Sequence, residues 1–188
     1  MIYSDILYPN ERLGIFIDGF SLYSISRALD FNVDFARLLK LFQNPDLETK
    51  IIRANYYVCT FDSSDGSEDP LRPLLDWLQF NGYRLVHKPK KSFTDQSGTA
   101  RNKSSINVEL AIDLLEQSDY IDHAILFTGD SDLRYAVEAA QRKGKRVTAI
   151  STLSKDHTAI SDDLRKTVDA FIDITDIKSL IERVDRKR

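Results

Sequence analysis

The sequence predicts a single α/β domain, a three-layer α/β/α sandwich with a mainly parallel sheet. Short apolar runs of strand length alternate along the chain with segments whose apolar residues recur at helical spacing, which is typical of a parallel sheet covered on both faces by helices. A length of 188 residues with 42% hydrophobic residues suits one folded domain. Because no internal repeat or linker is visible, we expect residues 1–188 to be one domain with a core at about 12–178, a short N-terminal extension and a basic C-terminal tail.

Six short apolar runs are expected to form the strands of the sheet. The first ends directly at Asp18-Gly19, and the second is rich in Ile, Tyr and Val, which favour strands. The later runs are bounded by turn residues or by helical patterns. The predicted strands are residues 13–17, 51–59, 83–87, 123–127, 146–150 and 170–174.

The helices are expected between these strands. Asp34 is a suitable N-cap, Pro70 would lie in the first turn of a helix, and Asn81-Gly82 is a common helix terminator. The predicted helices are residues 21–29, 34–42, 70–80, 106–115, 133–143, a short one near Leu164, and 177–184. The residues of the fourth helix expected to face the core are Val108, Ala111, Ile112 and Leu115.

Residues 88–103 contain few apolar side chains and are predicted to be a long exposed loop. Five basic residues and one aromatic residue gather there: Lys88, Lys90, Lys91, Arg101 and Lys103, with Phe93. The loop could hold a nucleic-acid backbone, with Phe93 stacked on a base, or it could be a solvated flexible loop. The sequence favours neither interpretation.

Oxygen-bearing side chains from distant segments are expected to meet at one edge of the sheet. They are Asp18, Asn107, Asp130 and Asp132. Asp18 follows the first strand and Asp130 the fourth, and ligands of parallel sheets bind beyond the carboxyl ends of the strands. Clustered carboxylates repel one another unless a cation or a proton offsets the repulsion. The pattern therefore predicts a site for a hard divalent cation, which could activate water for phosphodiester cleavage.

Each of these residues also has a simpler structural interpretation. Asp18 could serve only as a helix N-cap, and Asp130 could cap the helix that follows it. Two carboxylates in the turn at residues 129–132 exceed what one cap requires, which favours a functional role. Asn107 alone would be interpreted as a surface or capping amide.

Asp113 and Ser21 are weaker candidates for the same pocket. Asp113 lies between two apolar residues of a predicted helix, so it could line the pocket or occupy an exposed helix position. Ser21 could hydrogen-bond a metal-bound water or cap its own helix. The sequence does not decide between these alternatives.

The bulk composition restricts the partners and the compartment. A net charge of −3 and a pI near 5.6 argue against a generally basic nucleic-acid-binding surface but not against a local basic patch. No apolar run is long enough to span a bilayer, and the first residues lack the pattern of a secretion signal, so a cytoplasmic protein is expected. Cys59 has no second cysteine to pair with and is expected to be a small buried residue.

Other polar groups are not expected to form a site. His87, His123 and His157 lack zinc-like spacing with Cys59. The basic run at residues 142–146 connects a helix to a strand and is expected at the opposite edge, with no catalytic role.

Three segments carry a family pattern when they are taken in order. They are Phe16-Ile17-Asp18-Gly19-Phe20-Ser21-Leu22-Tyr23, Lys103-Ser104-Ser105-Ile106-Asn107-Val108-Glu109-Leu110-Ala111-Ile112-Asp113, and Thr128-Gly129-Asp130-Ser131-Asp132-Leu133. These segments resemble the NYN family of PIN-like nucleases, in particular its bacterial LabA-like branch. Residues 72–78 and 81–83 also look like that branch, so the resemblance covers nearly the whole chain.

The resemblance implies a PIN-like, Rossmann-like fold and cleavage of RNA that depends on Mg²⁺ or Mn²⁺. The RNA partner is expected to be single-stranded. It also suggests that two copies of the chain pair. Two positions depart from the family pattern, because Asn107 stands where the family has an aspartate and Ser21 where it has an asparagine. Carried over residue by residue, the metal ligands would be Asp18, Asp130 and Asp132, the supporting residue Asp113, and the residue facing phosphate Lys103. Apart from the resemblance, Ser21 and Thr128 are also expected to support the site.

Three functional hypotheses remain open from the sequence. The leading one is a metal-dependent ribonuclease, weakened because Asn107 removes one negative charge. The second is an inactive RNA-binding or regulatory module. The third, a phosphoacceptor domain, fits poorly because the third strand leads into His87-Lys88-Pro89 rather than an acceptor aspartate, and no Gly-rich phosphate loop supports a nucleotide-binding role.

Overall fold

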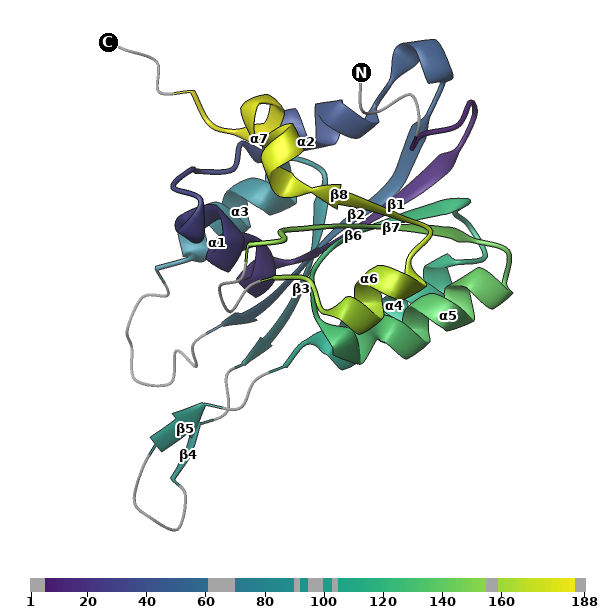
Figure 1. Ribbon diagram of the computed structural model, residues 1–188. Helices are drawn as coiled ribbons and strands as arrows, with labels where there is room; N and C mark the ends of the chain where they lie inside the picture. Colours follow the sequence, from purple (N-terminus) through teal and green to yellow (C-terminus); the bar gives the residue numbers. More distant parts are fainter. Residues whose placement is uncertain are drawn as a thin grey trace.

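The chain folds around one six-stranded sheet (Figure 1). The structure is a computed structural model that describes residues 6–60, 70–89, 105–154 and 159–184, together with the backbone of two short strands at 92–94 and 100–102. The strands of the large sheet are β1 (Arg12–Asp18), β2 (Lys50–Thr60), β3 (Tyr83–Pro89), β6 (His123–Phe127), β7 (Arg146–Ser151) and β8 (Ala170–Asp173). They lie in the order β3-β2-β1-β6-β7-β8, and every neighbouring pair is parallel.

Helices cover both faces of this sheet (Figure 1). The α-helices are α1 (Gly19–Ala28), α2 (Phe35–Phe42), α3 (Arg72–Phe80), α4 (Asn107–Gln117), α5 (Arg134–Arg142), α6 (Asp162–Thr167) and α7 (Ile174–Ile181), and short 3-10 turns are η1 (Pro45–Leu47) and η3 (Ser131–Leu133). Buried residues of α1, α2, α3 and α7 form one hydrophobic cluster with the sheet. Those of α4, α5 and α6 form a second cluster on the other face. The predicted three-layer α/β/α sandwich is therefore confirmed.

The order of the strands determines where a ligand site can form. The chain starts in the middle of the sheet at β1, proceeds outward through β2 and β3, and then crosses back to β6 on the other side of β1. The crossover creates a switch point between the carboxyl ends of β1 and β6, which is the usual ligand site in such sheets. Asp18 is the last residue of β1, and Asp130 lies three residues beyond the end of β6.

The structure corrects two expectations about local structure. In α4 the buried residues are Leu110, Asp113 and Leu114, whereas Val108 and Ile112, predicted to face the core, are 64% and 51% exposed. Apolar residues occur on two sides of this helix, so the sequence alone did not identify the side that packs on the sheet.

The segment predicted as a continuous loop also contains strands. β3 extends through Pro89, and β4 (Ser92–Thr94) pairs antiparallel with β5 (Ala100–Asn102). The two short strands have no repeated apolar alternation, which is the signal on which the strand predictions depended. Within the described residues, no helix is both long and apolar enough to cross a membrane.

Candidate metal and nucleic-acid site

Asp18 occupies the end of the central strand and caps the helix that follows. Its Oδ1 accepts hydrogen bonds from the backbone N–H groups of Phe20 (3.0 Å) and Ser21 (3.3 Å). Its Oδ2 accepts a hydrogen bond from the Ser21 hydroxyl at 2.5 Å. The residue is only 6% exposed. Asp18 is therefore an N-cap, as one interpretation predicted, and Ser21 fixes the orientation of its carboxylate.

Gly19 is required where β1 turns into α1. A Cβ at this position would lie 2.7–2.8 Å from atoms of the Tyr56 ring and hydroxyl and 2.8 Å from the Tyr57 carbonyl oxygen. These distances are too short for a side chain, so only glycine lets β2 approach the start of the helix. The close approach explains the Asp-Gly pair at the end of β1.

Asp130 and Asn107 contact each other across the switch point. The Asn107 amide Nδ2 donates a 2.7 Å hydrogen bond to Asp130 Oδ2, and Asn107 is the first residue of α4. Asp130 Oδ1 accepts from the Asp132 backbone N–H at 2.9 Å and so caps η3. The Thr128 hydroxyl accepts a 3.3 Å hydrogen bond from the Asp130 backbone N–H. The side chain of Asp130 is thus held between a turn and the start of α4.

Asp18 and Asp130 interact electrostatically. Burial raises the pKa of the Asp18 carboxyl above its ordinary value, and the negative charge of Asp130 raises it further, although hydrogen bonds from Ser21 and Phe20 act in the opposite direction. Asp18 at the end of β1 and Asp130 beyond the end of β6 therefore influence one another at the predicted edge. A bound cation would relieve this unfavourable pairing, because positive charge stabilises both ionised carboxylates.

The third expected metal ligand, Asp132, is exposed, and its hydrogen bond with Asp130 uses its backbone N–H rather than its carboxylate. In the described part of the chain, no three His, Cys, Asp or Glu side chains are grouped closely enough to hold a metal ion. The residues that come together are Asp18 and Asp130 with the Asn107 amide. These three oxygen-bearing side chains suit a hard cation that retains several waters, such as Mg²⁺ or Mn²⁺. The metal-ligand role of Asp132 stays a prediction.

Asp113 belongs to a separate buried network. Its Oδ2 forms an ion pair with Arg84 Nη1 at 2.6 Å and accepts a 2.9 Å hydrogen bond from the Tyr57 hydroxyl. Arg84 also reaches Asn55, which lies fully buried in β2. These contacts tie α4 to β2 and β3. The sequence did not indicate that Asp113 contacts Arg84 and Tyr57. Its supporting role at the acidic site stays a prediction.

The basic residues of the predicted loop are only partly described. Lys88 Nζ forms an ion pair with Glu109 Oε1 at 2.8 Å and donates to the Ser105 carbonyl oxygen at 3.2 Å. This contact binds the end of β3 to the first turn of α4. Lys90, Lys91 and Lys103, and the side chains of Phe93 and Arg101, lie outside the described residues.

Two polar residues near this edge were missed by the sequence interpretation. Glu109 lies in the first turn of α4, and its hydrogen bond with Lys88 lowers the pKa of its carboxyl despite partial burial. Ser151 ends β7 and is fully buried. Its hydroxyl has no hydrogen-bond partner within the part of the chain that the structure describes. Ser151 could have been singled out from the sequence in the same way as Asp18, because it is a polar residue at the carboxyl end of an apolar strand.

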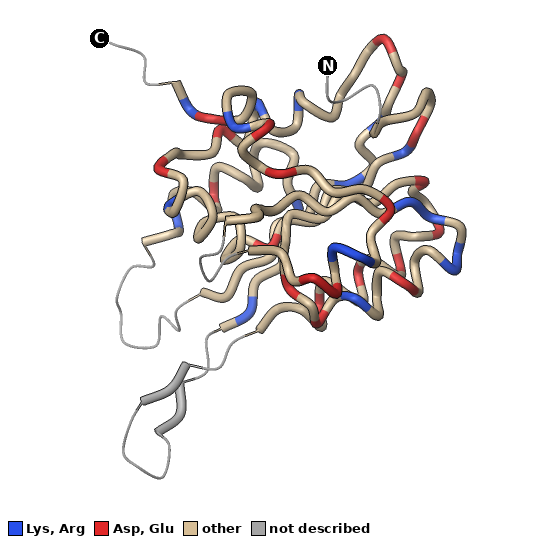
Figure 2. The backbone as a smooth tube through the Cα atoms, viewed as in Figure 1, with Lys and Arg blue, Asp and Glu red and all other residues tan. Residues whose placement is uncertain are grey.

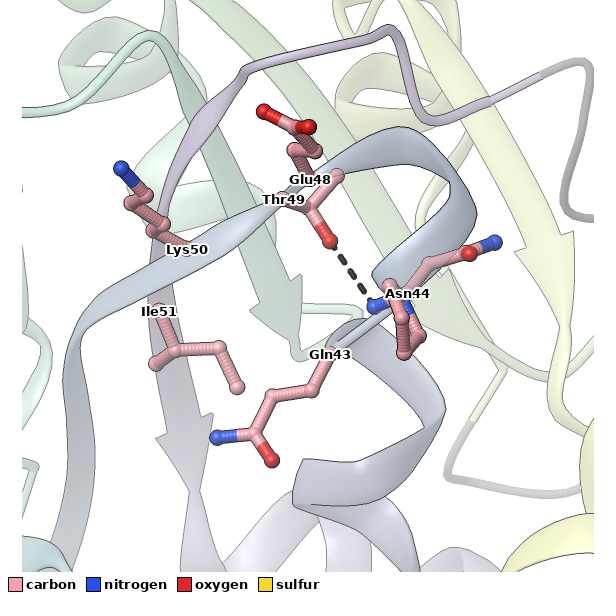
Figure 3. A pocket seen from close by; sticks show the side chains of 7 residues that line it. Gln43, Asn44, Glu48, Thr49, Lys50 and Ile51 are labelled. Atoms are coloured by element: carbon pink, nitrogen blue, oxygen red, sulfur yellow. Dashed lines mark hydrogen bonds between the residues drawn. The ribbon is translucent and has the colours of Figure 1, made fainter.

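Two cavities of the protein lie away from the acidic edge. One cavity of about 520 Å³ is lined by residues 43–45 and 48–51, where the Asn44 backbone N–H donates to the Thr49 hydroxyl at 3.0 Å (Figure 3). It lies at the start of β2, at the opposite edge of the sheet. Another, of about 590 Å³, adjoins Arg84 and Asp113. Neither of these two cavities is lined by Asp18, Asn107 or Asp130.

We expect Asp18→Asn to stabilise the metal-free protein at neutral pH. An asparagine keeps the N-cap but removes a charge that is unfavourable in the folded state. Because the folded pKa of Asp18 is raised, the group contributes stability below its unfolded pKa near 3.8, and that contribution is lost as the pH rises through the folded pKa. The Tm in EDTA at pH 7 should rise by roughly 2–4 °C, and the difference should vanish near pH 3.

Asp34→Asn provides the matched control for this measurement. Asp34 caps α2 through the equivalent two backbone contacts, at 3.0 Å each, and its side chain does not belong to the acidic edge. Its Tm should change little. A lower Tm for Asp18→Asn than for the wild type at pH 7 would show that the Asp18 charge is stabilising.

The geometry defines an α/β domain of the Rossmann type with paired acidic groups at its switch point. The chain belongs to the NYN domain family, whose model matches residues 12–178. NYN domains are PIN-like nuclease domains, and such domains generally use divalent metals.

Comparisons with individual proteins agree with this assignment. The chain is 32% identical over 179 residues to the low amplitude and bright protein LabA of Synechococcus elongatus, a match that covers 94% of this chain and 90% of LabA. A crystal structure of a protein of unknown function from Vibrio parahaemolyticus superposes with a TM-score of 0.66 at 25% identity, covering 87% of this chain and 92% of that one. The resemblance to the LabA-like branch is thus confirmed.

Proposed function

We propose that the protein is a metal-dependent ribonuclease that hydrolyses phosphodiester bonds of single-stranded RNA. The observation that carries the proposal is the placement of Asp18 at the end of β1 and of Asp130 just beyond the end of the neighbouring strand β6, where the Asn107 amide contacts it. Membership of a PIN-like nuclease family supports it. The cytoplasm, where RNA substrates occur, is the compartment that we propose.

Each residue of the acidic edge would contribute a separate task. Asp18 and Asp130 would hold Mg²⁺ or Mn²⁺, and the ion would supply the positive charge that stabilises the developing charge on the phosphate. Ser21 keeps the Asp18 carboxylate in a fixed orientation. The turn at Thr128 and the cap of η3 do the same for Asp130. Burial of Asp18 limits the water around it, which strengthens every charge interaction there.

Asn107 limits the activity that this arrangement can reach. Its amide donates to Asp130 Oδ2, so it occupies a carboxylate oxygen that a cation would otherwise use. An amide oxygen could still bind the metal after the side chain rotates, but it brings no negative charge. The same contact supports the second candidate function, an RNA-binding or regulatory module without cleavage.

A cleavage assay with a labelled single-stranded RNA tests the proposal. The wild type should cut the RNA with Mn²⁺ or Mg²⁺ and not with EDTA, and Asp130→Asn should lower the rate about 100-fold. The control is Asp122→Asn, because Asp122 pairs with Arg12 at the opposite edge of the sheet. Cleavage that survives Asp130→Asn unchanged, or that needs no metal, would contradict the proposal.

The oligomeric state is a separate question. We propose a homodimer, on the basis of the family resemblance. Light scattering across a concentration series should give twice the mass of the 21.5 kDa chain. A mass of one chain throughout the series would contradict the dimer while leaving the proposed activity intact.

A further inference from the structure

Two aromatic side chains stand exposed beside the acidic edge. Phe20 is 78% exposed and Tyr23 is 59% exposed, and both lie in the first turns of α1 directly after Asp18. Side chains three residues apart project from the same side of a helix, so the two rings are neighbours. The backbone N–H of Phe20 donates to the Asp18 carboxylate, which fixes the position of this turn relative to the acidic site.

We propose that Phe20 and Tyr23 form a stacking platform for bases of single-stranded RNA, an inference that rests on the proposed ribonuclease function. Aromatic faces bind successive bases of a single strand with little sequence preference. The platform begins two residues from a carboxylate that would act at the phosphodiester backbone. A strand held on α1 by its bases would therefore present its backbone to the acidic edge.

The charge along α1 suits the same occupant. Arg27 lies one helical turn beyond Tyr23 on the same side of the helix and is exposed, so its guanidinium is available to a phosphate group. The described residues 19–28 contain no acidic side chain. A helix face with two exposed rings followed by a cation matches a chain of bases and phosphates better than it matches an apolar protein surface.

The opposite edge of the sheet provides a matched pair of aromatic residues. Phe80 ends α3 and is 89% exposed, and Tyr120 follows α4 and is 65% exposed. Both precede a strand of the parallel sheet, so they lie at the edge where strands begin. They reproduce the residue types and the exposure of the proposed platform but are distant from the acidic site.

The test measures binding separately from cleavage. Fluorescence anisotropy in EDTA compares a labelled oligoadenylate with an abasic oligomer of the same length and charge. We expect the double variant Phe20→Leu/Tyr23→Leu to bind oligoadenylate at least about ten-fold more weakly and the abasic oligomer with unchanged affinity. Phe80→Leu/Tyr120→Leu should match the wild type with both probes.

Several results would overturn the platform. One is that the wild type does not bind oligoadenylate. Others are that the Phe20→Leu/Tyr23→Leu variant loses equal affinity for both probes, or that the control variant loses as much affinity for oligoadenylate. A last one is that the mass of the Phe20→Leu/Tyr23→Leu variant in light scattering changes while its RNA affinity does not, which would assign the two rings to contact with a second copy of the chain. If base-dependent binding is found without metal-dependent cleavage, the platform stands and the ribonuclease proposal fails. If cleavage is found and the double variant binds like the wild type, the ribonuclease stands and the platform fails.

Discussion

Asn107→Asp should convert the acidic edge into a tighter metal site and raise Mn²⁺-dependent RNA cleavage. The amide now donates to Asp130 Oδ2 at 2.7 Å, and a carboxylate in its place would repel Asp130. Two like unit charges 4 Å apart repel each other with an energy of about 4 kcal/mol at an effective dielectric constant of 20. Because a cation would remove this repulsion, the variant gains more from metal than the wild type does.

We expect the Asn107→Asp variant to be less stable without metal and to bind metal more tightly than the wild type. In EDTA we expect the variant to lose roughly 1–3 kcal/mol of folding stability, because a hydrogen bond is replaced by a like-charge contact. With Mn²⁺ the Tm should recover, since ligand binding stabilises the folded state. The dissociation constant for Mn²⁺ should fall about ten-fold relative to the wild type, which isothermal titration measures directly.

Asn44→Asp is the matched control for the added charge. Asn44 caps η1 near the start of β2, and its Oδ1 accepts from the Asp46 backbone N–H at 2.9 Å. An aspartate there keeps the cap but lies away from the acidic edge. If Mn²⁺ raised the Tm of wild type and Asn107→Asp by the same amount, the proposed role of position 107 would be wrong.

The sequence predicted the parts of this site that depend on strand order and residue type. Asp18 and Asp130 follow apolar strands, and parallel strands place their carboxyl ends on the same edge, so their convergence could be anticipated. The sequence did not reveal which oxygen each group offers. The contact between the Asn107 amide and Asp130, and the ion pair of Asp113 with Arg84, depend on side-chain rotamers and on the rotation of α4.

The same limit applies to the other edge of the sheet. His123 was expected only to border a strand, yet it is fully buried and lies between Glu11 and Thr148. Glu11 is distant from it in the sequence and belongs to a segment expected to be only an extension. Such a network has no local sequence signal, because its members are brought together only by the packing of β1, β6 and β7.

This buried network around Glu11 leads to the largest expected effect on stability. Glu11 is 7% exposed. Its Oε1 pairs with Arg146 Nη1 at 2.5 Å, and its Oε2 lies 3.3 Å from His123 Nδ1 and accepts the Tyr8 backbone N–H at 2.9 Å. An ionised carboxylate only accepts hydrogen bonds, so His123 Nδ1 carries a proton, and His123 Nε2 lies 2.7 Å from the Thr148 hydroxyl oxygen. Glu11 thus joins the N-terminal segment to the starts of β6 and β7.

Glu11→Gln should cost about 3 kcal/mol of unfolding free energy at pH 7. Removing the charge of one partner of a buried ion pair leaves the other charge poorly compensated. Within the described part of the chain, Arg146, whose side chain is only 25% exposed, would keep only its hydrogen bond to the Ile6 carbonyl oxygen and its contact with the Tyr8 ring. Glu138→Gln is the control, because Glu138 pairs with Arg134 on the exposed face of α5, where such pairs contribute less than about 1 kcal/mol. Urea denaturation measures the unfolding free energy of both variants. Equal losses in Glu11→Gln and Glu138→Gln would show that the buried pair contributes no more than the exposed one.

The pH dependence of this loss separates charge from shape. Burial would raise the pKa of the Glu11 carboxyl, but the hydrogen bonds from His123 and Tyr8 and the charge of Arg146 outweigh burial, so its pKa lies below the ordinary value of 4.5. The stability that Glu11 contributes is therefore present above pH 4.5 and is lost as the pH falls through the lowered folded pKa. The difference in unfolding free energy between the wild type and Glu11→Gln should therefore become smaller as the pH falls below 4.5. A gap that stays constant down to the acid transition would show that the glutamine disturbs packing rather than removing a charge.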